Sequence, residues 1–259
     1  MGLEESRGHL GDNMRLDRFA RFSVLALALC VSSVAFGQEK TGSQPGFALK
    51  PGTARIVLMR PVIGVGAQST GGVYEPNADW TSQARDNITA ALEQAQSRLG
   101  NQVVAYSEAA SGEGAVVSQY SHVFTAVADS VIEYQFFPGN RLPTKKRKDS
   151  FEWGIGPDIS GLKSLGDADY ALFITTHDEY GSTGRKMLQL VGALGGVSVP
   201  TGVHVGHAGL IDLKTGALVW LNADRKMGGD VRTPEGAQKR VEQLLEGFPG
   251  RSAAPAAGQ

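Results

Sequence analysis

Three stretches of the chain repeat apolar residues at the three- and four-residue steps that mark the buried face of an amphipathic helix. They cover residues 80–99, 116–132 and 234–248. Asp79 suits the N-cap of the first helix, because its short side chain can accept a hydrogen bond from the first turn. Thr233 suits the N-cap of the last helix, where proline follows at the first helical position. The pattern therefore predicts three helices, each with one buried face.

Shorter apolar runs bounded by glycine or proline predict buried strands at residues 55–59, 102–106 and 168–176. Predicted helices lie between these strands, so the strands need crossover connections and are expected to pair in parallel. Residues 62–76 contain four glycines and are expected to form an extended segment or a hairpin. Residues 155–165 carry a weaker helical pattern.

The clearest local pattern is the run LIDLKTGALVW at residues 210–220. Its centre, from Leu213 to Gly216, fits a type I turn followed by a glycine in the left-handed conformation, which predicts a tight hairpin. Residues 217–221 are apolar on both faces, which favours a central strand over an edge strand. The predicted fold is therefore α/β: a single-domain mixed β-sheet flanked by helices, with a late β-hairpin and a C-terminal helix.

The N-terminal region has the pattern of a secretory signal peptide. Residues 14–21 carry three arginines, residues 22–31 form an apolar run, and small residues precede the end of the pattern at Gly37. The apolar run is too short to span a bilayer, which takes about 20 residues. We therefore expect residues 1–37 to be a signal peptide that directs the protein to the periplasm. Met14 is a candidate for the true start, because the residues before it are polar and partly acidic.

The single cysteine of the sequence, Cys30, lies inside this apolar run. A lipoprotein signal has a small residue directly before its cysteine, whereas Leu29 stands there, so lipid anchoring at Cys30 is not expected. Cleavage after Gly37 would leave a mature chain without any thiol for a disulfide. The formal net charge of −1 offers no electrostatic footprint for nucleic acid.

Composition divides the rest of the chain into three expected parts. Residues 38–51 are polar, with glycine and proline, and are expected to be a linker. Residues 52–249 carry the predicted elements of the α/β domain, and residues 250–259 are expected to be a disordered tail. The basic run at residues 145–148 has no aromatic residue within it, so a solvated loop is favoured over an anion or nucleic-acid patch.

Acidic and histidine residues follow the third predicted strand. His177, Asp178 and Glu179 come where ligands gather in open α/β sheets, and His204 and His207 could join them around a metal ion. Two histidines three residues apart in an extended chain face opposite sides, however, and do not form the helical pair of a metalloprotease. The sequence also has no nucleophile elbow and no phosphate-binding loop. We therefore expect no metal site and no cofactor, and we assign no catalytic residue.

The run MLQLVGALGGVSVPTGVHV, from Met187 to Val205, is mostly apolar and about as long as a bilayer span. Its paired glycines and Pro200 disfavour a continuous spanning helix. Three interpretations remain. The leading one is a loop or strand pair packed in the core; the others are a mobile flap over a partner or ligand site, and a segment that inserts in a membrane or packs in an oligomer.

The late part of the chain resembles a known superfamily. The matching runs are ADYALFITT at residues 168–176, GLIDLKTGALVW at residues 209–220, and GGD at residues 228–230, followed by a terminal helix. This order is similar to that of bacterial envelope lipoproteins, including curli-secretion (CsgG-type) proteins and penicillin-binding-protein activators. The resemblance implies a mixed α/β domain that acts through protein contacts in assembly, regulation or transport at the cell envelope. It supplies no catalytic residues.

The leading functional hypothesis is an exported, periplasmic or envelope-associated protein that acts through contacts with another envelope protein or with itself. One alternative is a periplasmic metal-dependent or small-molecule-binding enzyme that uses the residues after Thr176, and another is an oligomeric pore or ring component. Peripheral membrane contact through Met187 to Val205 is a further expectation. An exposed apolar patch in that run would favour the contact hypothesis, and a scatter of the acidic and histidine residues would count against the enzyme.

Export predicts a defined mature N-terminus. Protein recovered from the periplasmic or envelope fraction is expected to begin at Gln38 when analysed by N-terminal sequencing, because the residues at positions −1 and −3 are small. A variant with Ala35→Lys is expected to keep its leader, since a large charged residue at position −3 blocks cleavage. A mature chain that begins with a lipid-modified Cys30 would contradict this prediction.

Overall fold

The computed structural model describes residues 39–107, 112–137, 150–162 and 165–251. The chain from Gln38 onward groups into one compact unit. Its strands are β1 (Glu39–Ser43), β2 (Arg55–Leu58), β3 (Val62–Gln68), β4 (Tyr74–Pro76), β5 (Gln102–Ala105), β6 (Trp153–Gly154), β7 (Tyr170–Gly181), β8 (Gly202–Asp212) and β9 (Ala217–Asp224). Its helical segments are α2 (Ala78–Gln96), α3 (Gly114–Val131), the π-helical turn η3 (Ile132–Phe136), the 3₁₀ turn η5 (Pro157–Gly161), α4 (Thr183–Leu194) and α5 (Pro234–Leu244). The predicted signal peptide, the basic run at residues 145–148 and most of the predicted tail lie outside the described residues.

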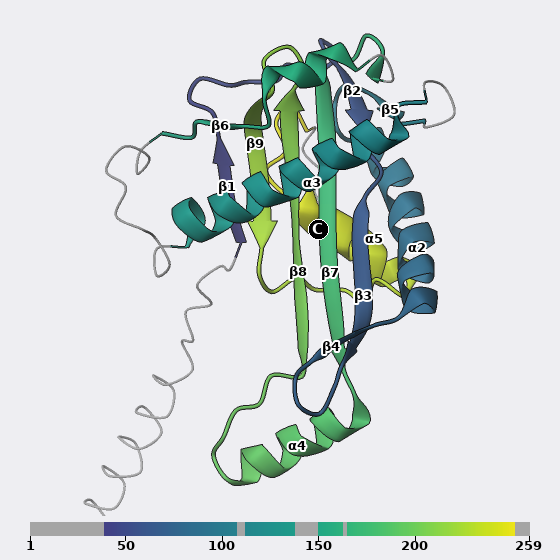
Figure 1. The fold of residues 1–259 in the computed structure, drawn as a ribbon, viewed down its shortest axis with the longest axis vertical. Helices are drawn as coiled ribbons and strands as arrows, with labels where there is room; N and C mark the ends of the chain where they lie inside the picture. The colour runs from purple at the N-terminus through teal and green to yellow at the C-terminus, as the bar shows by residue number, and fades with distance from the viewer. Residues whose placement is uncertain (1–38, 108–111, 138–149, 163–164, 252–259) are drawn as a thin grey trace, which may run out of the picture. The chain divides into compact units, whose positions relative to one another are not determined.

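The strands form one mixed sheet in the order β1-β9-β8-β7-β2-β5 (Figure 1). β7 pairs in parallel with β2 and then with β3, which follow one another along the same edge, and it pairs antiparallel with β8. β2 also pairs in parallel with β5, and β9 lies antiparallel between β8 and β1. The predicted α/β class, with parallel early strands and an antiparallel late hairpin, is confirmed.

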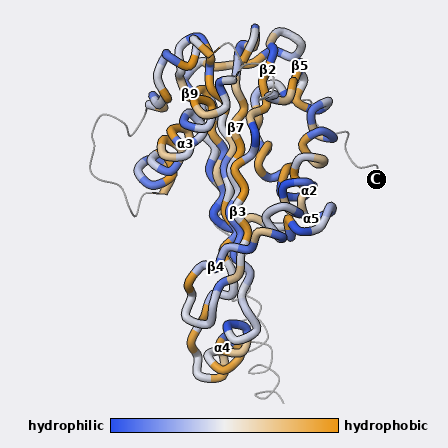
Figure 2. Tube along the Cα trace, turned by 45° about the vertical axis from the view of Figure 1, so that its right-hand side comes forward, coloured by the Kyte–Doolittle hydropathy of each residue, from blue (hydrophilic) through white to orange (hydrophobic). Residues whose placement is uncertain are grey.

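Helices cover both faces of the sheet because the side chains of β7 alternate between two cores. Leu172 and Ile174 belong to the core under α2 and α5, whereas Ala171 and Phe173 belong to the core under α3. The ring of Phe173 stacks on Phe124 of α3, with ring centroids 4.7 Å apart. Figure 2 shows α3 on one side of the strands and α2 with α5 on the other.

β7 and β8 continue well beyond the part of the sheet that the helices cover, and β3 accompanies β7 as far as Gly181. β7 and β8 stay paired as far as Tyr180 and Gly202, and α4 connects them (Figures 1 and 2). In both views α4 lies across the far ends of the two strands. We call residues 182–201, which comprise α4 and the loop that leads into β8, the tip.

The prediction that residues 38–51 form a linker is wrong. Residues Glu39 to Ser43 form β1, which pairs antiparallel with β9 from Asp224 to Trp220. Leu49 is buried in the core. β1 is an edge strand that pairs with β9 on one side, so hydrogen bonds along the backbone hold it in place without a run of apolar side chains.

Three local predictions also need correction. The N-cap of α2 is Asn77 rather than Asp79: Oδ1 of Asn77 accepts a hydrogen bond from the backbone N–H of Trp80 at 2.9 Å. Among the described residues of 155–165, only Pro157–Gly161 is helical, as a 3₁₀ turn. β7 runs to Gly181, so the acidic and histidine residues lie within the strand and not after its end.

The predicted hairpin is confirmed. Gly216 has a φ of +71°, and its N–H donates to the carbonyl oxygen of Asp212 at 2.8 Å. A carboxylate oxygen of Asp212 accepts from the N–H groups of Lys214 and Thr215, both at 2.9 Å, which closes the turn. β9 is almost entirely buried, as expected of a central strand.

The turn glycine should tolerate no side chain. A Cβ at Gly216 would overlap the carbonyl oxygen of Gly156, so Gly216→Ala is expected to lower the free energy of unfolding by about 2–4 kcal/mol in urea titrations. Gly46 has a similar φ of +78° but nothing within 4 Å of its Cβ position. The matched change Gly46→Ala should therefore cost only about 1–2 kcal/mol. Equal losses in the two variants would show that the contact with Gly156 is unimportant.

Candidate functional site

The candidate residues from the sequence divide between the two faces of β7 and β8. Asp178 and His204 lie opposite one another in the β7–β8 register and face α5. His177 and Glu179 flank Asp178 along β7 and therefore point to the opposite face, since neighbouring strand residues alternate. The sheet separates the two groups, so they form two clusters rather than one site.

Asp178 and Arg240 form a fully buried ion pair between β7 and α5. Nη1 of Arg240 donates to Oδ2 of Asp178 and Nη2 donates to Oδ1, each at 2.8 Å. The remaining N–H groups of the guanidinium donate to Oγ1 of Thr176 at 2.5 Å and to the carbonyl oxygens of Gly228 and Gly229, both at 3.1 Å. All five N–H groups of Arg240 are thus occupied, which is the condition for burying such a charge.

His204 completes the surroundings of the Asp178 carboxylate. Nδ1 of His204 lies 2.7 Å from Oδ1 of Asp178. Burial alone would raise the pKa of Asp178, but hydrogen bonds from His204 and Arg240 outweigh it, so the pKa lies below its usual value. The carboxylate is therefore held ionised by fixed protein donors. This arrangement fits a structural role in joining β7, β8 and α5 better than proton transfer to a ligand.

A second cation lies beside this network. The guanidinium carbon of Arg232 is 3.6 Å from the ring centre of Tyr180 and 4.6 Å from that of Trp80. Nε and Nη2 of Arg232 donate to the carboxylate of Asp230 at 2.9 and 2.7 Å, and these bonds lower the pKa of Asp230 to about 2. Burial, followed by the nearby charge of Asp178, raises the pKa of Tyr180. Asp230 and Arg232 therefore pair with each other ahead of α5.

The cluster on the opposite face is smaller. Nε2 of His177 lies 3.0 Å from Oε1 of Glu179, and Nε2 of Gln68 donates to Oε2 of Glu179 at 3.1 Å. The ring of Tyr74 contacts His177, with ring centroids 4.6 Å apart. Both oxygens of Glu179 thus have protein partners. These residues link β7 to the β3–β4 hairpin, next to the tip.

His207 belongs to neither cluster. It is buried beside Phe124 of α3, and burial lowers its pKa to about 4, which keeps the ring neutral at neutral pH. Its face is opposite to that of His204, as the three-residue spacing predicts. Within the residues that the structure describes, no three His, Cys, Asp or Glu side chains group closely enough to hold a metal ion. The five candidate residues therefore do not converge.

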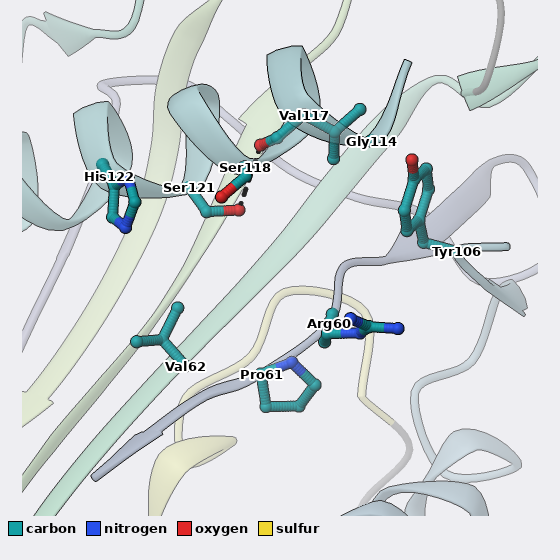
Figure 3. A pocket seen from close by; sticks show the side chains of 9 residues that line it. All are labelled: Arg60, Pro61, Val62, Tyr106, Gly114, Val117, Ser118, Ser121 and His122. Carbon is teal, nitrogen blue, oxygen red and sulfur yellow. Dashed lines mark hydrogen bonds between the residues drawn. The ribbon is translucent and has the colours of Figure 1, made fainter. Parts of the chain in front are cut away.

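A cavity of about 210 Å³ lies between α3 and the connection from β2 to β3 (Figure 3). Arg60, Pro61 and Tyr106 line one side, and Ser121 and other α3 residues line the other. The cavity lies beyond the carboxyl ends of β2 and β5, a usual ligand position in parallel α/β sheets. It is smaller than the roughly 300 Å³ of typical ligand sites, and the Ser121 hydroxyl already donates to a carbonyl oxygen of its own helix. No sequence motif predicts this cavity.

The tip presents the most exposed apolar surface of the described chain. α4 has no buried residue, although it is 12 residues long. Met187, Leu190, Val191 and Leu194 recur at helical spacing on its outer face, with exposed fractions of 58, 60, 59 and 84 %. We call these four residues the outer stripe. Val197, in the loop that follows, is 59 % exposed.

Specific contacts hold the other face of α4 against the protein. Ser182 caps the helix by accepting from the N–H of Arg185 at 3.3 Å. Nε of Arg185 donates to the carbonyl oxygen of Pro200 at 2.7 Å, and Nη1 donates to that of Thr70 at 3.3 Å. A Cβ at Gly192 would come within 3.0 Å of the carbonyl oxygen of Val197, so a small residue is needed there. These contacts fix α4 with the outer stripe toward solvent.

The core-packed interpretation of Met187 to Val205 is therefore wrong. The apolar residues from Met187 to Leu194 form an exposed helix whose other side contacts the protein through Arg185 and Gly192, and only Val203 and Val205 join a strand pair, in β8 beside β7. None of the helices in the described residues has both the length and the apolar content that crossing a bilayer requires. A periodicity count could have detected the helix, since Met187, Leu190, Val191 and Leu194 follow a helical spacing in the sequence.

The buried ion pair yields a stability prediction. Arg240→Met strands the Asp178 carboxylate in the core and is expected to cost about 3–5 kcal/mol of unfolding free energy in urea titrations. The double change Arg240→Met with Asp178→Leu should cost less than Arg240→Met alone, because no unpaired charge remains. As a control, Arg98→Met removes a surface pair with Glu242 and should cost no more than about 1 kcal/mol. A double variant that is less stable than the single one would contradict this account.

Comparisons with known proteins identify no family for this chain. No protein-family profile and no curated protein matches the sequence. Two solved structures of PelC dodecamers from Paraburkholderia phytofirmans match with 14 and 13 % identity and TM-scores of 0.38 and 0.36; they cover 83 and 84 % of this chain and 100 % of theirs. A DUF4136 family protein from Bacteroides thetaiotaomicron matches with 9 % identity and a TM-score of 0.33, over 82 % of this chain and 96 % of its own. At these scores, nothing about binding or assembly follows for this chain.

Proposed function

We propose that this protein is exported to the cell envelope and acts there through noncovalent contacts of the tip rather than through catalysis. The observation that carries the proposal is the outer stripe of α4. Its four apolar side chains face solvent on a helix whose inner face is fixed by hydrogen bonds. Exposed apolar surface of this kind marks a site that another surface covers.

The polar side chains on β7 are already bound by other protein groups, which supports a contact function. A general acid or base needs a side chain that can exchange a proton with a bound substrate. Asp178 is instead enclosed by Arg240, Thr176 and His204. Glu179 is engaged by protein donors on both of its oxygens. The acidic residues after Thr176 thus stabilise the two long strands, and these strands carry the tip.

All three candidate partners would bind the same surface of the protein. An envelope protein, a second copy of this chain and a lipid surface would each cover the outer stripe with apolar groups. The secretory pattern of residues 1–37 supports an envelope location. The resemblance to envelope lipoproteins that work in assembly, regulation or transport supports the same class of function.

Removing the outer stripe should release the protein from the envelope. The full chain, expressed with its own leader in a bacterial host, is expected to sediment with the envelope fraction. Leu190→Gln combined with Leu194→Gln should lower the bound fraction about tenfold or more, because glutamine keeps the helix but loses the apolar contact. Quantitative immunoblots of the pellet and the soluble periplasmic fraction measure the change.

Val123→Gln is the matched control, since Val123 is also exposed but lies on α3, away from the tip. It should sediment as the unmodified chain does. Thermal unfolding should be nearly unchanged in all of these variants, because none of the altered side chains is buried. Full envelope association of the double variant would exclude the tip as the contact surface.

A further inference from the structure

We propose that the partner of the tip is a lipid bilayer surface with anionic headgroups, on which α4 lies flat with its outer stripe among the acyl chains. This inference rests on the proposed contact function and names its partner. An interfacial helix has an apolar face that enters the boundary between headgroups and acyl chains, and basic residues that stay at headgroup level. α4 has both features, and its place in the fold suits them.

The charge of the tip matches an anionic surface. Lys186, in the first turn of α4, is exposed, and Arg185, whose guanidinium is bound on the inner face, adds a second positive charge to the tip. The sequence contains no acidic residue between Glu179 and Asp212, so no carboxylate offsets these two cations within the tip. Basic residues near an anionic membrane each strengthen binding, roughly fivefold per residue.

The shape of the tip favours a flat partner over a second protein. α4 lies across the far ends of β7 and β8, so its long side faces outward from the sheet (Figure 1). A plane laid against this end of the molecule meets α4 along its length. A stable protein interface takes roughly 20–30 residues on each side, whereas the whole tip has 20, and those on its inner face contact the rest of the protein. Insertion of a few apolar side chains into lipid needs no complementary pocket.

Contacts on the inner face of α4 fix the helix with its outer stripe away from the protein. Gly184 lies against Oγ1 of Thr70, and Arg185 ties α4 to Thr70 in the β3–β4 turn and to Pro200 in the loop before β8. Two segments of chain, the β3–β4 turn and the loop before β8, therefore hold the helix in place. The outer stripe is presented without a rearrangement, so binding loses little conformational freedom.

Vesicle flotation tests the proposal directly. The chain from Gln38 onward, which forms a compact unit, is mixed with vesicles of equal parts phosphatidylglycerol and phosphatidylcholine, or of phosphatidylcholine alone. It is expected to float with the anionic vesicles, and less so as salt is raised. Leu190→Gln with Leu194→Gln should lower the partition coefficient about a hundredfold, at about tenfold per leucine. Lys186→Gln should lower it about fivefold on anionic vesicles only.

A site-specific probe separates insertion from adsorption. Because Cys30 is the only cysteine in the sequence, the chain from Gln38 has none, and Leu194→Cys gives a single position for an environment-sensitive dye. The dye emission should shift to shorter wavelength with anionic vesicles. The same dye at Val123→Cys on α3 should not respond. An equal response at both positions would overturn the proposed orientation.

The outcomes also separate this inference from the proposed function. If the chain binds neither kind of vesicle, but the leucine variant still leaves the envelope fraction in cells, the lipid partner is excluded and a protein contact of the tip stands. If light scattering shows self-association that the leucine changes abolish, the partner is a second copy and the lipid proposal is overturned. If the leucine changes alter neither vesicle binding nor fractionation, both proposals fail.

Discussion

The place where β7 and β8 begin to extend toward the tip depends on the ion pair between Asp178 of β7 and Arg240 of α5. The ion pair joins residues 62 positions apart in the sequence, and it also fixes Thr176 and the loop at Gly228 and Gly229. A buried charge that loses its partner costs several kcal/mol, so β7, α5 and this loop cannot separate one at a time. His204 extends the same network to β8. The long strands therefore leave the body of the protein from a fixed point.

The sequence predicts those parts of the fold in which burial and periodicity agree. The helices near residues 80–99, 116–132 and 234–248 each turn an apolar face to the core, and the hairpin at Gly216 needs only local turn chemistry. β1 escapes prediction because an edge strand is stabilised by backbone pairing with a distant β9, which its polar side chains do not record. The 3₁₀ turn at Pro157 is too short for any period to be counted.

The candidate site was harder to predict, for two physical reasons. The alternation of side chains along β7 places Asp178 on one face and its neighbours on the other, so residues adjacent in sequence do not share a site. The partner that decides the role of Asp178 is Arg240, which lies on a distant helix and belongs to no motif. The outer stripe has the opposite difficulty. Its helical period is visible in the sequence, but a period alone does not tell whether a face is turned to the core or to solvent.

Stability and contact are consequently carried by different parts of the protein. Around Asp178, polar side chains are buried and every donor of Arg240 is used, so changes to these residues are expected to unfold the protein. At the tip, the apolar side chains of the outer stripe make no contact with the core, so folding gives no reason for them to be apolar. Exposed apolar groups instead lower solubility. A surface that adds nothing to folding and carries this disadvantage is best explained by a partner that covers it.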